Sequence, residues 1–444
     1  MKQPKSVQVV VYRESAGSRQ YLLLRRHRPG SEDFWQPVSG SLEDGESYAD
    51  AARRELEEET GIGDPASLTE VGLVDRFAIA AAWRGLYEPD VTHNVQAAFA
   101  ARVDRADVAI DPGEHNDFCW TTYDRARALV RYEPNRRAID LVETGLAWAR
   151  RRPFTLELPN GRLVLGERTL VMGVLNVTPD SFSDGGAFET VDAAVERALQ
   201  LESDGADILD VGGESTRPGA ASIDTAEELR RVMPVIRALS GRLRIPISID
   251  TMRSETARAA VDAGAAIIND VSGLRFDAEL AAVAAEAGTG LILMHMRGTP
   301  ATMQKLPPVE NILDDVTANL LESLTLAEER GVDPSRVVTD PGIGFGKTVA
   351  QNVEIVARLD AVAALDRPVL IGTSRKSFLG ALTGRGPADR SHATTASVAA
   401  AVLRGAHIVR VHDVAEAVDA ARVADAVLVA LGPRERAELA RPVR

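Results

Sequence analysis

The sequence contains a single cysteine, Cys119, and it lacks any long apolar run. One cysteine excludes an intramolecular disulfide and a zinc site built from several cysteines, which suits a reducing compartment. The N-terminus runs directly into a strand-like segment without a signal-peptide core, and no window approaches the roughly 18 unbroken apolar residues of a membrane span. We therefore expect a cytoplasmic protein in which Cys119 is a small core residue.

Basic residues are scarce relative to acidic ones. The chain has 51 Lys and Arg against 65 Asp and Glu, a net charge of −14, and no sustained basic run. This balance argues against nucleic acid or a membrane as the main partner. Any anionic substrate must therefore be met by local basic groups or by a metal ion. With 444 residues, 45% of them hydrophobic, the chain is long enough for two or three ordinary domains.

The C-terminal part repeats one pattern, a short apolar run that ends in a polar residue and is followed by a helical pattern. The first unit begins at Leu170 and opens, after Asn176, into a polar and glycine-rich loop. Seven more units follow, and eight strand–helix units predict an α/β fold closed into a (β/α)8 TIM barrel. The expected strand ends are Asn176, Asp210, Asp250, Asn269, Met294, Asp340, Gly372 and Val411.

Helices and a hairpin complete this pattern. A capping box from Thr225 to Glu228 predicts the start of one helix, and residues 254–263 predict another. Before the first barrel strand, a turn at residues 159–161 joins two short apolar segments, which predicts a hairpin that plugs the N-terminal end of the barrel.

These patterns predict two domains. The predicted ranges are an N-terminal domain at 1–149, a basic linker with a proline at 150–154, a barrel at 155–432 and a polar tail at 433–444.

The N-terminal part carries an acidic helix that we expect from about Tyr48 to Thr60. Glu55, Glu58 and Glu59 are spaced at i, i+3 and i+4, which puts their carboxylates on one helix face. Such a face is often simply solvated. Like charges at this spacing repel unless a cation lies between them, however, and clustered hard oxygens suit Mg²⁺ or Mn²⁺ bound together with substrate phosphates.

The segment from Gly40 to Ile62 resembles the Nudix box and fills every position of its pattern. The matching residues are Gly40, Glu46, Arg54, Glu55, Leu56, Glu58, Glu59, Gly61 and Ile62. The resemblance implies an α/β/α Nudix fold that cleaves a nucleoside diphosphate linked to another group, using a divalent metal and an activated water. Glu55, Glu58 and Glu59 are then the metal ligands, or one of them is the base, and we expect all three to be catalytic.

Segments outside the box resemble the bacterial dihydroneopterin triphosphate pyrophosphohydrolases. They are residues 34–40, 87–94, 114–115, 120 and 135–138. By this resemblance Glu114 is a further metal ligand, whereas without it the residue reads as loop surface. The sequence has Thr-His-Asn-Val-Gln96 where that family has Thr-Arg-Asn-x-Glu, so the substrate of this half stays open.

Polar residues converge at the carboxyl ends of the predicted barrel strands, where a barrel builds its active site. Asp250, Asn269 and Asp340 suit a ligand rich in ring N–H donors, such as a pterin. Lys376 and Arg410, together with His412, suit an anionic group. Simpler interpretations exist: Asp250 as a helix N-cap, His412 as a loop histidine and Met294 as plain core. Arg410 is harder to explain in this way, because a cation in an apolar strand needs an anionic partner.

The same segments resemble dihydropteroate synthase, which condenses 6-hydroxymethyl-7,8-dihydropterin diphosphate with 4-aminobenzoate. The matching segments are residues 176–186, 210–219, 249–251, 268–270, 293–296, 340–347, 374–377 and 410–412. The implied substrate-binding residues are Thr216, Arg217, Pro218, Asp250, Asn269, Met294, Asp340, Phe345, Lys376, Ser377, Arg410 and His412. Asp250, Lys376 and Arg410 are also expected to be catalytic, Asn176 to bind Mg²⁺, and Asp184 to belong to a mobile loop. The resemblance further implies inhibition by sulfonamides and a homodimer formed through the barrel.

The leading hypothesis is a bifunctional folate enzyme whose N-terminal half removes pyrophosphate from dihydroneopterin triphosphate and whose barrel forms dihydropteroate. The N-terminal half could instead be a general nucleotide-sanitising hydrolase or a regulatory ligand-binding module. A pterin-binding methyltransferase would share the Asp and Asn residues of the barrel, but residues 215–218 and 374–377 favour the synthase.

Overall fold

The computed structural model describes residues 3–15, 18–27, 32–79, 81–89, 91–104, 107–144, 151, 153–178, 187–215, 222–363, 365–386 and 389–430. Contacts within the chain separate two compact units, and the main boundary falls between Arg150 and Arg151. Each unit is described by itself below. The predicted tail at 433–444, Asp184, and the predicted ligands Thr216, Arg217 and Pro218 lie outside the described residues.

The N-terminal unit is built on a seven-stranded mixed sheet in which β1 pairs in parallel with β6 and antiparallel with β2 and β4. The strands are β1 (Lys5–Ser15), β2 (Ser18–Arg26), β3 (Phe34–Gln36), β4 (Val38–Ser41), β5 (Ser67–Ala78), β6 (His93–Arg102) and β7 (His115–Thr121). The helices are α1 (Tyr48–Thr60), the 3-10 helix η1 (Ala81–Leu86), α2 (Tyr123–Leu129) and α3 (Glu133–Thr144).

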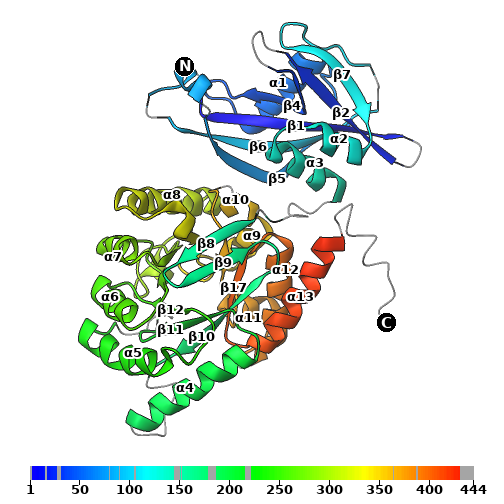
Figure 1. Cartoon of the computed structure of the whole chain (residues 1–444). Coiled ribbons are helices and arrows are strands. Elements are labelled where there is room, and N and C mark those ends of the chain that lie inside the picture. The colour runs from blue at the N-terminus through cyan, green and yellow to red at the C-terminus, as the bar shows by residue number, and fades with distance from the viewer. Residues whose placement is uncertain are drawn as a thin grey trace. The chain divides into compact units, whose positions relative to one another are not determined.

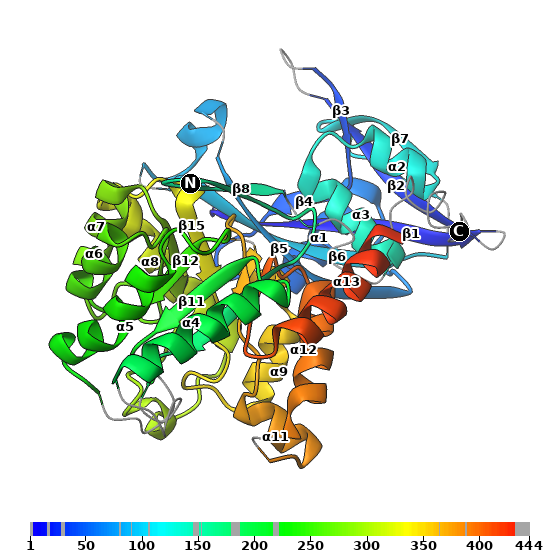
Figure 2. The same cartoon turned by 60° about the horizontal axis from the view of Figure 1, so that its bottom comes forward.

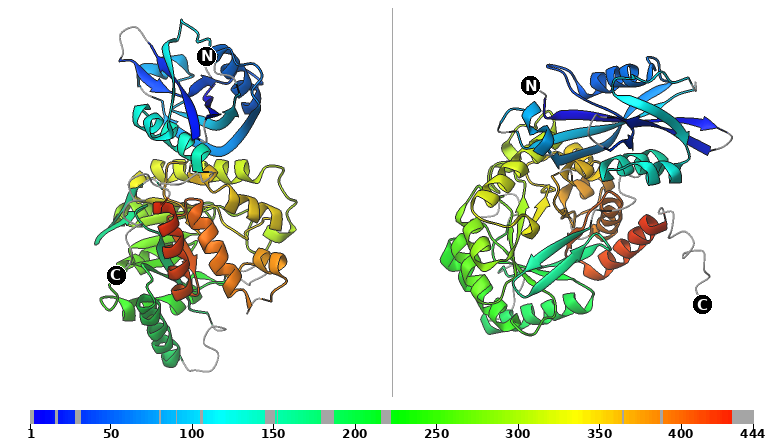
Figure 3. Two further views of the ribbon diagram at one scale, coloured as in Figure 1. Left: turned by 90° about the vertical axis from the view of Figure 1, so that its right-hand side faces the viewer. Right: turned by 45° about the horizontal axis from the view of Figure 1, so that its top comes forward.

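Alternation along the central strands creates two cores in this unit. Val9 of β1 packs in a core shared with Ala52 and Leu56 of α1. Its neighbour Val10 packs in a second core with Ile139 of α3. Successive strand residues point to opposite faces, so the sheet is covered on both sides (Figure 3, right). This arrangement confirms the predicted α/β/α sandwich.

The C-terminal unit is an eight-stranded parallel barrel with strand order β15-β14-β13-β12-β11-β10-β17-β16. The strands are β10 (Leu170–Asn176), β11 (Ile208–Gly212), β12 (Ile247–Asp250), β13 (Ile267–Asp270), β14 (Gly290–Met294), β15 (Val337–Asp340), β16 (Leu370–Ile371) and β17 (Ile408–Val411). A bridge between Thr339 and Val369 joins the two ends of this order. The prediction of a TIM barrel is thus confirmed.

Helices surround the barrel and follow one another along the chain (Figures 1 and 2). The α-helices are α4 (Ala187–Ser203), α5 (Thr225–Leu239), α6 (Ser254–Asp262), α7 (Glu279–Ala287), α8 (Ile312–Glu329), α9 (Val349–Ala357), α10 (Asp360–Ala363), α11 (Ser377–Thr383), α12 (Ser391–Leu403) and α13 (Val414–Ala430). The 3-10 helices are η3 (Met303–Lys305) and η4 (Pro334–Arg336). None of the described helices is long and apolar enough to cross a membrane.

A hairpin closes the N-terminal end of the barrel, as predicted. Strands β8 (Phe154–Leu158) and β9 (Gly161–Leu165) pair antiparallel. Leu156 and Leu165 are buried in one core with the first residues of several barrel strands, such as Leu170 and Ile208. The hairpin therefore shields from water the apolar side chains at this end of the barrel.

Some predicted boundaries were wrong. Strand β11 extends two residues beyond Asp210, because Gly212 still pairs with Asn176 on one side and Asp250 on the other. Strand β13 ends one residue after Asn269, and β16 ends one residue before Gly372. The alternation of apolar and polar residues gives only an approximate end, because a strand stops where its neighbours stop pairing.

The predicted capping box of α5 was also wrong. The N-cap is Asp224, whose carboxylate accepts a hydrogen bond of 2.8 Å from the Glu227 N–H. Glu228 instead turns inward and is buried, where Thr256 Oγ1 donates to its carboxylate at 2.7 Å. A tertiary partner has therefore outcompeted the local capping interaction.

Candidate active sites

Arg410 lies at the centre of the polar cluster at the carboxyl ends of the barrel strands. Its Nε donates to Asp210 Oδ2 at 2.7 Å, and its Nη2 lies 2.7 Å from Asp250 Oδ2. Asn269 Nδ2 donates to the same Asp210 oxygen at 3.1 Å. Strands β17, β11, β12 and β13 each contribute one member, so barrel closure brings them together. The arginine thus has the anionic partners that its place in an apolar strand requires.

Asp250 is not a helix cap. The N-cap of α6 is Arg253, and the Ser254 N–H donates to Asp277 at 2.8 Å. The Asp250 carboxylate is buried, and burial raises its pKa to about 7 against the lowering effect of Arg410. Burial lowers the pKa of Arg410, but the charges of Asp210 and Asp250 outweigh this and leave that pKa above its ordinary value. The guanidinium therefore stays charged.

Asp340 and Lys376 flank the same end of the barrel. Asp340 Oδ1 accepts a hydrogen bond of 2.7 Å from the Gly342 N–H, and burial raises the pKa of Asp340 to about 6. The Lys376 Nζ lies 4.2 Å from the centre of the Phe345 ring. This geometry is a cation–π contact, which holds the ammonium group over an apolar surface.

A buried lysine supports the turn that carries Phe345. Lys347 Nζ donates to the carbonyl oxygens of Gly342 at 2.8 Å and Phe345 at 3.2 Å. Gly342 has φ of 66°, and a Cβ there would lie 1.9 Å from the His295 carbonyl oxygen, so only glycine fits. Burial lowers the pKa of Lys347 to about 7.

Four further predicted residues of the barrel are described, namely Met294, His412, Asn176 and Ser377. Met294 is buried with Phe345 in an apolar group that also holds Met252, Met296 and Met303. Met294 is therefore packed as a core residue, in agreement with the simpler interpretation of it. The His412 Nδ1 lies 3.0 Å from Ser374 Oγ. Asn176 ends β10 and is half-buried, and exposed Ser377 begins α11.

Arg253 ties together the two ends of the segment that follows β11. Its Nη1 lies 2.6 Å from Glu214 Oε2 and 3.1 Å from Glu228 Oε2. Its Nη2 donates to the Ile223 carbonyl oxygen at 2.6 Å. Glu214 and Ile223 stand on either side of residues 216–221, which the structure leaves undescribed. One guanidinium therefore fixes both ends of this segment to the start of α6.

In the N-terminal unit, Arg54 connects the glutamates of the Nudix box. Its Nη1 lies 2.9 Å from both Glu55 Oε1 and Glu58 Oε2, and its Nε donates to Glu46 at 2.9 Å. Gly40 leaves the space that Glu55 occupies, since a Cβ there would lie 1.7 Å from the Glu55 carboxyl carbon. Burial raises the pKa of Glu55. The predicted shared face is therefore present, with Glu58 at its exposed edge.

Glu59 is buried and faces a second group of residues. Its Oε2 accepts the Ser39 N–H at 3.1 Å, while its Oε1 lies 3.6 Å from Arg26 Nη1. Arg26 Nη2 pairs with Glu114 Oε2 at 2.8 Å. Glu59, Glu114 and His115 each offer one ligand atom within 4.8 Å of the others, and Glu59 Oε1 has no hydrogen-bond partner. This donor set, with an unsatisfied carboxylate oxygen, fits a divalent cation. Burial raises the pKa of Glu59 to about 8.

The sequence reasoning missed four residues of these two sites: Asp210, Lys347, Arg26 and His115. A signal existed for Asp210, which stands at a predicted strand end, and for His115, which follows Glu114. Lys347 ends the matching segment 340–347, but no role was predicted for it. Arg26 gave no signal, because its role depends on partners that only the fold brings near.

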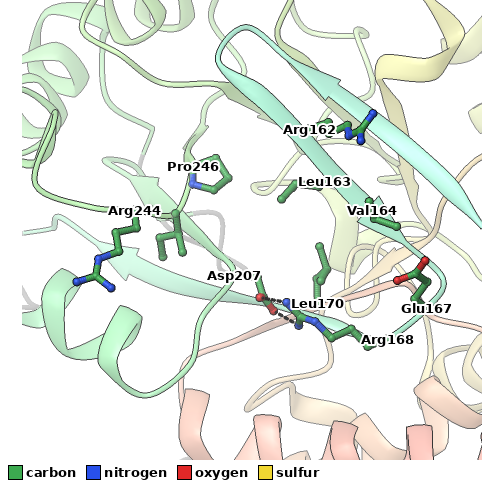
Figure 4. Close-up of a pocket in the computed structure, with 10 residues that line it drawn as sticks. Arg162, Leu163, Val164, Glu167, Arg168, Leu170, Asp207, Arg244 and Pro246 are labelled. Atoms are coloured by element: carbon green, nitrogen blue, oxygen red, sulfur yellow. Dashed lines mark hydrogen bonds and ion pairs between the residues drawn. The ribbon is translucent and has the colours of Figure 1, made fainter.

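A separate pocket of about 570 Å³ lies at the N-terminal end of the barrel (Figure 4). Leu163 of the hairpin, Leu170 and Pro246 line it together with Arg168, whose guanidinium is paired with Asp207 at 2.5 and 2.9 Å. The polar cluster lies at the opposite ends of the strands. Barrel enzymes place their chemistry at the carboxyl ends, so this pocket is no part of the candidate active site.

Comparisons with known proteins agree with this geometry. The family model described as "Pterin binding enzyme" matches residues 172–412, more than half of the chain, and the model "NUDIX domain" matches residues 2–142. The dihydropteroate synthase of Synechocystis sp. is 45% identical over 277 residues, which cover 62% of this chain and 96% of that protein.

Solved structures give the same result. The dihydropteroate synthase of Xanthomonas albilineans with 4-aminobenzoic acid matches with a TM-score of 0.58 and 45% identity, over 62% of this chain and 98% of that chain. The structure of the same enzyme in complex with 7,8-dihydropteroate has a TM-score of 0.54 and 44% identity, over 60% of this chain and 95% of that chain. The chain belongs to the pterin-binding enzyme family, as a dihydropteroate synthase barrel that carries an N-terminal NUDIX domain.

Proposed function

We propose that the barrel condenses 6-hydroxymethyl-7,8-dihydropterin diphosphate with 4-aminobenzoate, and that the NUDIX half hydrolyses dihydroneopterin triphosphate. The observation that carries the first part is the position of Arg410. It places a permanent cation within hydrogen-bonding distance of two buried carboxylates. A ligand with ring N–H donors at one end and an anionic leaving group at the other needs this combination.

The pterin ring is assigned to the acceptors of the cluster. Asp250 and Asp340 accept from ring N–H groups, Asn269 supplies an amide, and Lys376 donates to a ring acceptor. Met294 gives this end of the barrel an apolar surface for the flat ring. Thr216, Arg217, Pro218, Phe345 and Ser377 are assigned to 4-aminobenzoate by the family resemblance.

In the proposed reaction the C–O bond between the pterin methylene carbon and the diphosphate breaks, and its electron pair leaves with pyrophosphate. Arg410 and His412 stabilise the charge of the leaving group, while the carboxylate of Asp250 faces the cationic ring. The lone pair of the aminobenzoate nitrogen then forms the C–N bond, and this nitrogen releases a proton. A divalent cation would add positive charge at the leaving group. Asn176 offers an amide oxygen to hold it, since no side-chain hydrogen bond uses that amide within the described part of the barrel.

Replacement of Lys376 tests this assignment. Lys376→Met removes one charged donor to the pterin, which corresponds to about 1.5–3 kcal/mol, or roughly a 10- to 100-fold loss in kcat/KM for the pterin diphosphate. Lys305→Met is the matched control, because Lys305 is an exposed lysine of η3 in the same unit. Product formation from labelled 4-aminobenzoate is the assay. Equal rates for the two variants would contradict the role given to Lys376.

In the NUDIX half, Glu55, Glu58, Glu59 and Glu114 are assigned to a divalent cation, either Mg²⁺ or Mn²⁺. Such a cation supplies charge for the substrate phosphates and lowers the pKa of the attacking water. The contacts of Arg54 hold Glu55 and Glu58 in place, and Gly40 leaves room for the first of them. The choice of a pterin triphosphate rests on resemblance alone, and a general nucleoside triphosphate hydrolase or a regulatory module is the alternative.

The NUDIX substrate is tested by pyrophosphate release from dihydroneopterin triphosphate, compared with ordinary and oxidised nucleoside triphosphates. Glu58→Gln should abolish the release, whereas Glu57→Gln should not, because the exposed Glu57 stands at a position of the box that the pattern leaves unspecified. A Glu58-dependent preference for the pterin supports the proposal, and a preference for nucleotides supports the sanitising alternative. Release that is unchanged by Glu58→Gln would support the regulatory alternative.

A homodimer formed through the barrel is also part of the proposal, on the basis of the family resemblance. Light scattering during gel filtration should then give roughly twice the chain mass of 47.6 kDa. A mass of one chain at all concentrations would exclude it.

A further inference from the structure

The imidazole of His115 is the buried polar group of the NUDIX half whose environment is hardest to explain without a ligand. His115 is the first residue of β7 and its side chain is completely buried. Neither ring nitrogen has a hydrogen-bond partner among the described residues. Buried polar side chains are satisfied in the large majority of cases, so an imidazole with two unsatisfied nitrogens calls for a partner that the protein itself does not provide.

The position of Glu59 indicates where a partner of the His115 imidazole would lie. His115 Nε2 lies 3.9 Å from Glu59 Oε1, which is itself buried and unsatisfied. This distance is too long for a hydrogen bond. Two donor atoms that bind one cation at about 2.1 Å each lie at most about 4.2 Å apart, so the pair is spaced for a shared ion.

Glu114 completes the group from its exposed side. The Glu114 side chain is 48% exposed, and one of its oxygens lies within 4.8 Å of the ligand atoms of Glu59 and His115. A side chain with this freedom can rotate by the small amount that coordination requires. Glu59 and His115, in contrast, are held by burial, so two of the three donors are already in place.

Arg26 supplies the positive charge between the carboxylates when no ion is bound. Its Nη2 pairs with Glu114 at 2.8 Å and its Nη1 lies 3.6 Å from Glu59. A divalent cation therefore competes with Arg26 for Glu114. The imidazole gives the cation an additional ligand that Arg26 does not use, because neither ring nitrogen of His115 makes a hydrogen bond with the guanidinium.

We propose that His115 is a nitrogen ligand of the cation in the NUDIX half, together with Glu59 and Glu114. Two carboxylates suit hard cations, while an imidazole adds preference for first-row transition metals, so the site should bind Mn²⁺ more tightly than Mg²⁺. The function of this ligand rests on the proposed metal-dependent hydrolysis, but its coordination to the cation can be tested without any substrate. Neither the Nudix box nor the resemblance of the flanking segments assigns a role to this histidine.

The experiment is electron spin-echo envelope modulation on the full-length chain loaded with one Mn²⁺ per chain, without substrate. The unmodified protein should show nitrogen modulation from a coordinated imidazole, and His115→Gln should lose it and bind Mn²⁺ roughly 10- to 100-fold more weakly. His27→Gln is the control, because His27 is a 53% exposed histidine of the same unit that pairs with Asp33. It should leave both the modulation and the affinity unchanged.

A second measurement covers the case in which His115→Gln fails to fold. The unmodified chain labelled with ¹⁵N-histidine should show the ¹⁵N pattern in place of the ¹⁴N pattern. Absence of nitrogen modulation in the unmodified protein, its persistence in His115→Gln, or failure to bind Mn²⁺ would each overturn the inference. Nitrogen coordination without hydrolysis of any triphosphate would leave His115 as a ligand and overturn the proposed hydrolase. Hydrolysis of a triphosphate without nitrogen coordination would overturn His115 as a ligand and leave the proposed hydrolase standing.

Discussion

Removal of Arg253 should destabilise the barrel far more than removal of a comparable surface arginine. Arg253 is 11% exposed, and its partners Glu214 and Glu228 are 10% and 1% exposed. In Arg253→Gln both carboxylates stay buried without their cation. Breaking a buried ion pair from one side costs about 3–5 kcal/mol, because the remaining charge is desolvated and unpaired.

Arg258→Gln is the matched control. Arg258 lies on α6, five positions after Arg253, and pairs with Glu286 at 2.8 Å, but the two side chains are 53% and 62% exposed. Exposed pairs of this kind contribute about 0–1 kcal/mol. The two substitutions therefore remove the same chemical group from neighbouring positions and differ mainly in burial.

The aromatic residues provide an internal reference for the assay. All four tryptophans and all six tyrosines lie in the first 148 residues, so the barrel contains neither type. Tryptophan fluorescence then follows the NUDIX half, while circular dichroism at 222 nm also reports the barrel helices. Arg253→Gln should lower the barrel midpoint by roughly 6–20 °C and leave the fluorescence midpoint unchanged. Arg258→Gln should shift neither by more than about 4 °C.

Two results would refute this reasoning. Equal midpoint shifts for Arg253→Gln and Arg258→Gln would show that burial does not determine how much the Arg253 ion pairs contribute to stability. A fluorescence midpoint that falls together with the dichroism signal would show that the loss is not confined to the barrel. Glu228→Gln combined with Arg253→Gln should recover part of the loss, since one of the unpaired charges is then removed.

Three further outcomes are expected. Gly40→Ala should reduce NUDIX pyrophosphate release at least about tenfold, since the added methyl would occupy the space of Glu55, and an unchanged rate would contradict the need for that space. Binding of 6-hydroxymethylpterin, measured calorimetrically, should weaken as pH falls through about 7 and about 6, where Asp250 and then Asp340 gain a proton and lose acceptor capacity. Asp340→Asn should bind weakly and keep only the step near pH 7, and an unchanged profile would contradict this role of Asp340. Lys347→Met should lower stability by about 1–3 kcal/mol in denaturant titrations, because the Gly342 and Phe345 carbonyl groups lose their buried donor, and an unchanged midpoint would argue against this support.

The sequence predicted which residues lie together in the barrel site, but it did not predict the hydrogen bonds between them. Strand periodicity is local, so the ends of β12 and β15 at Asp250 and Asp340 were predicted correctly from the order of apolar residues. The partners of Arg410 lie 160 and 200 positions away along the chain, and no local pattern encodes such a pairing. Asp210 was therefore predicted only as a strand end, two residues too early, and not as a partner of Arg410.

In the NUDIX half, too, part of the site could be predicted from the sequence and part could not. Helical spacing alone placed Glu55, Glu58 and Glu59 on one face of α1, because 3.6 residues per turn fixes that geometry before any tertiary contact forms. Only the packing of α1 decided that Glu59 is buried against Arg26 and His115 while Glu58 is 58% exposed. Burial sets the pKa and hydrogen-bond state of each carboxylate, and burial depends on which strands lie opposite the helix. The sequence by itself therefore determined the order of the elements and the residue types at each site, and the tertiary structure decided which charges are paired, which are left unsatisfied, and hence where a cation can bind.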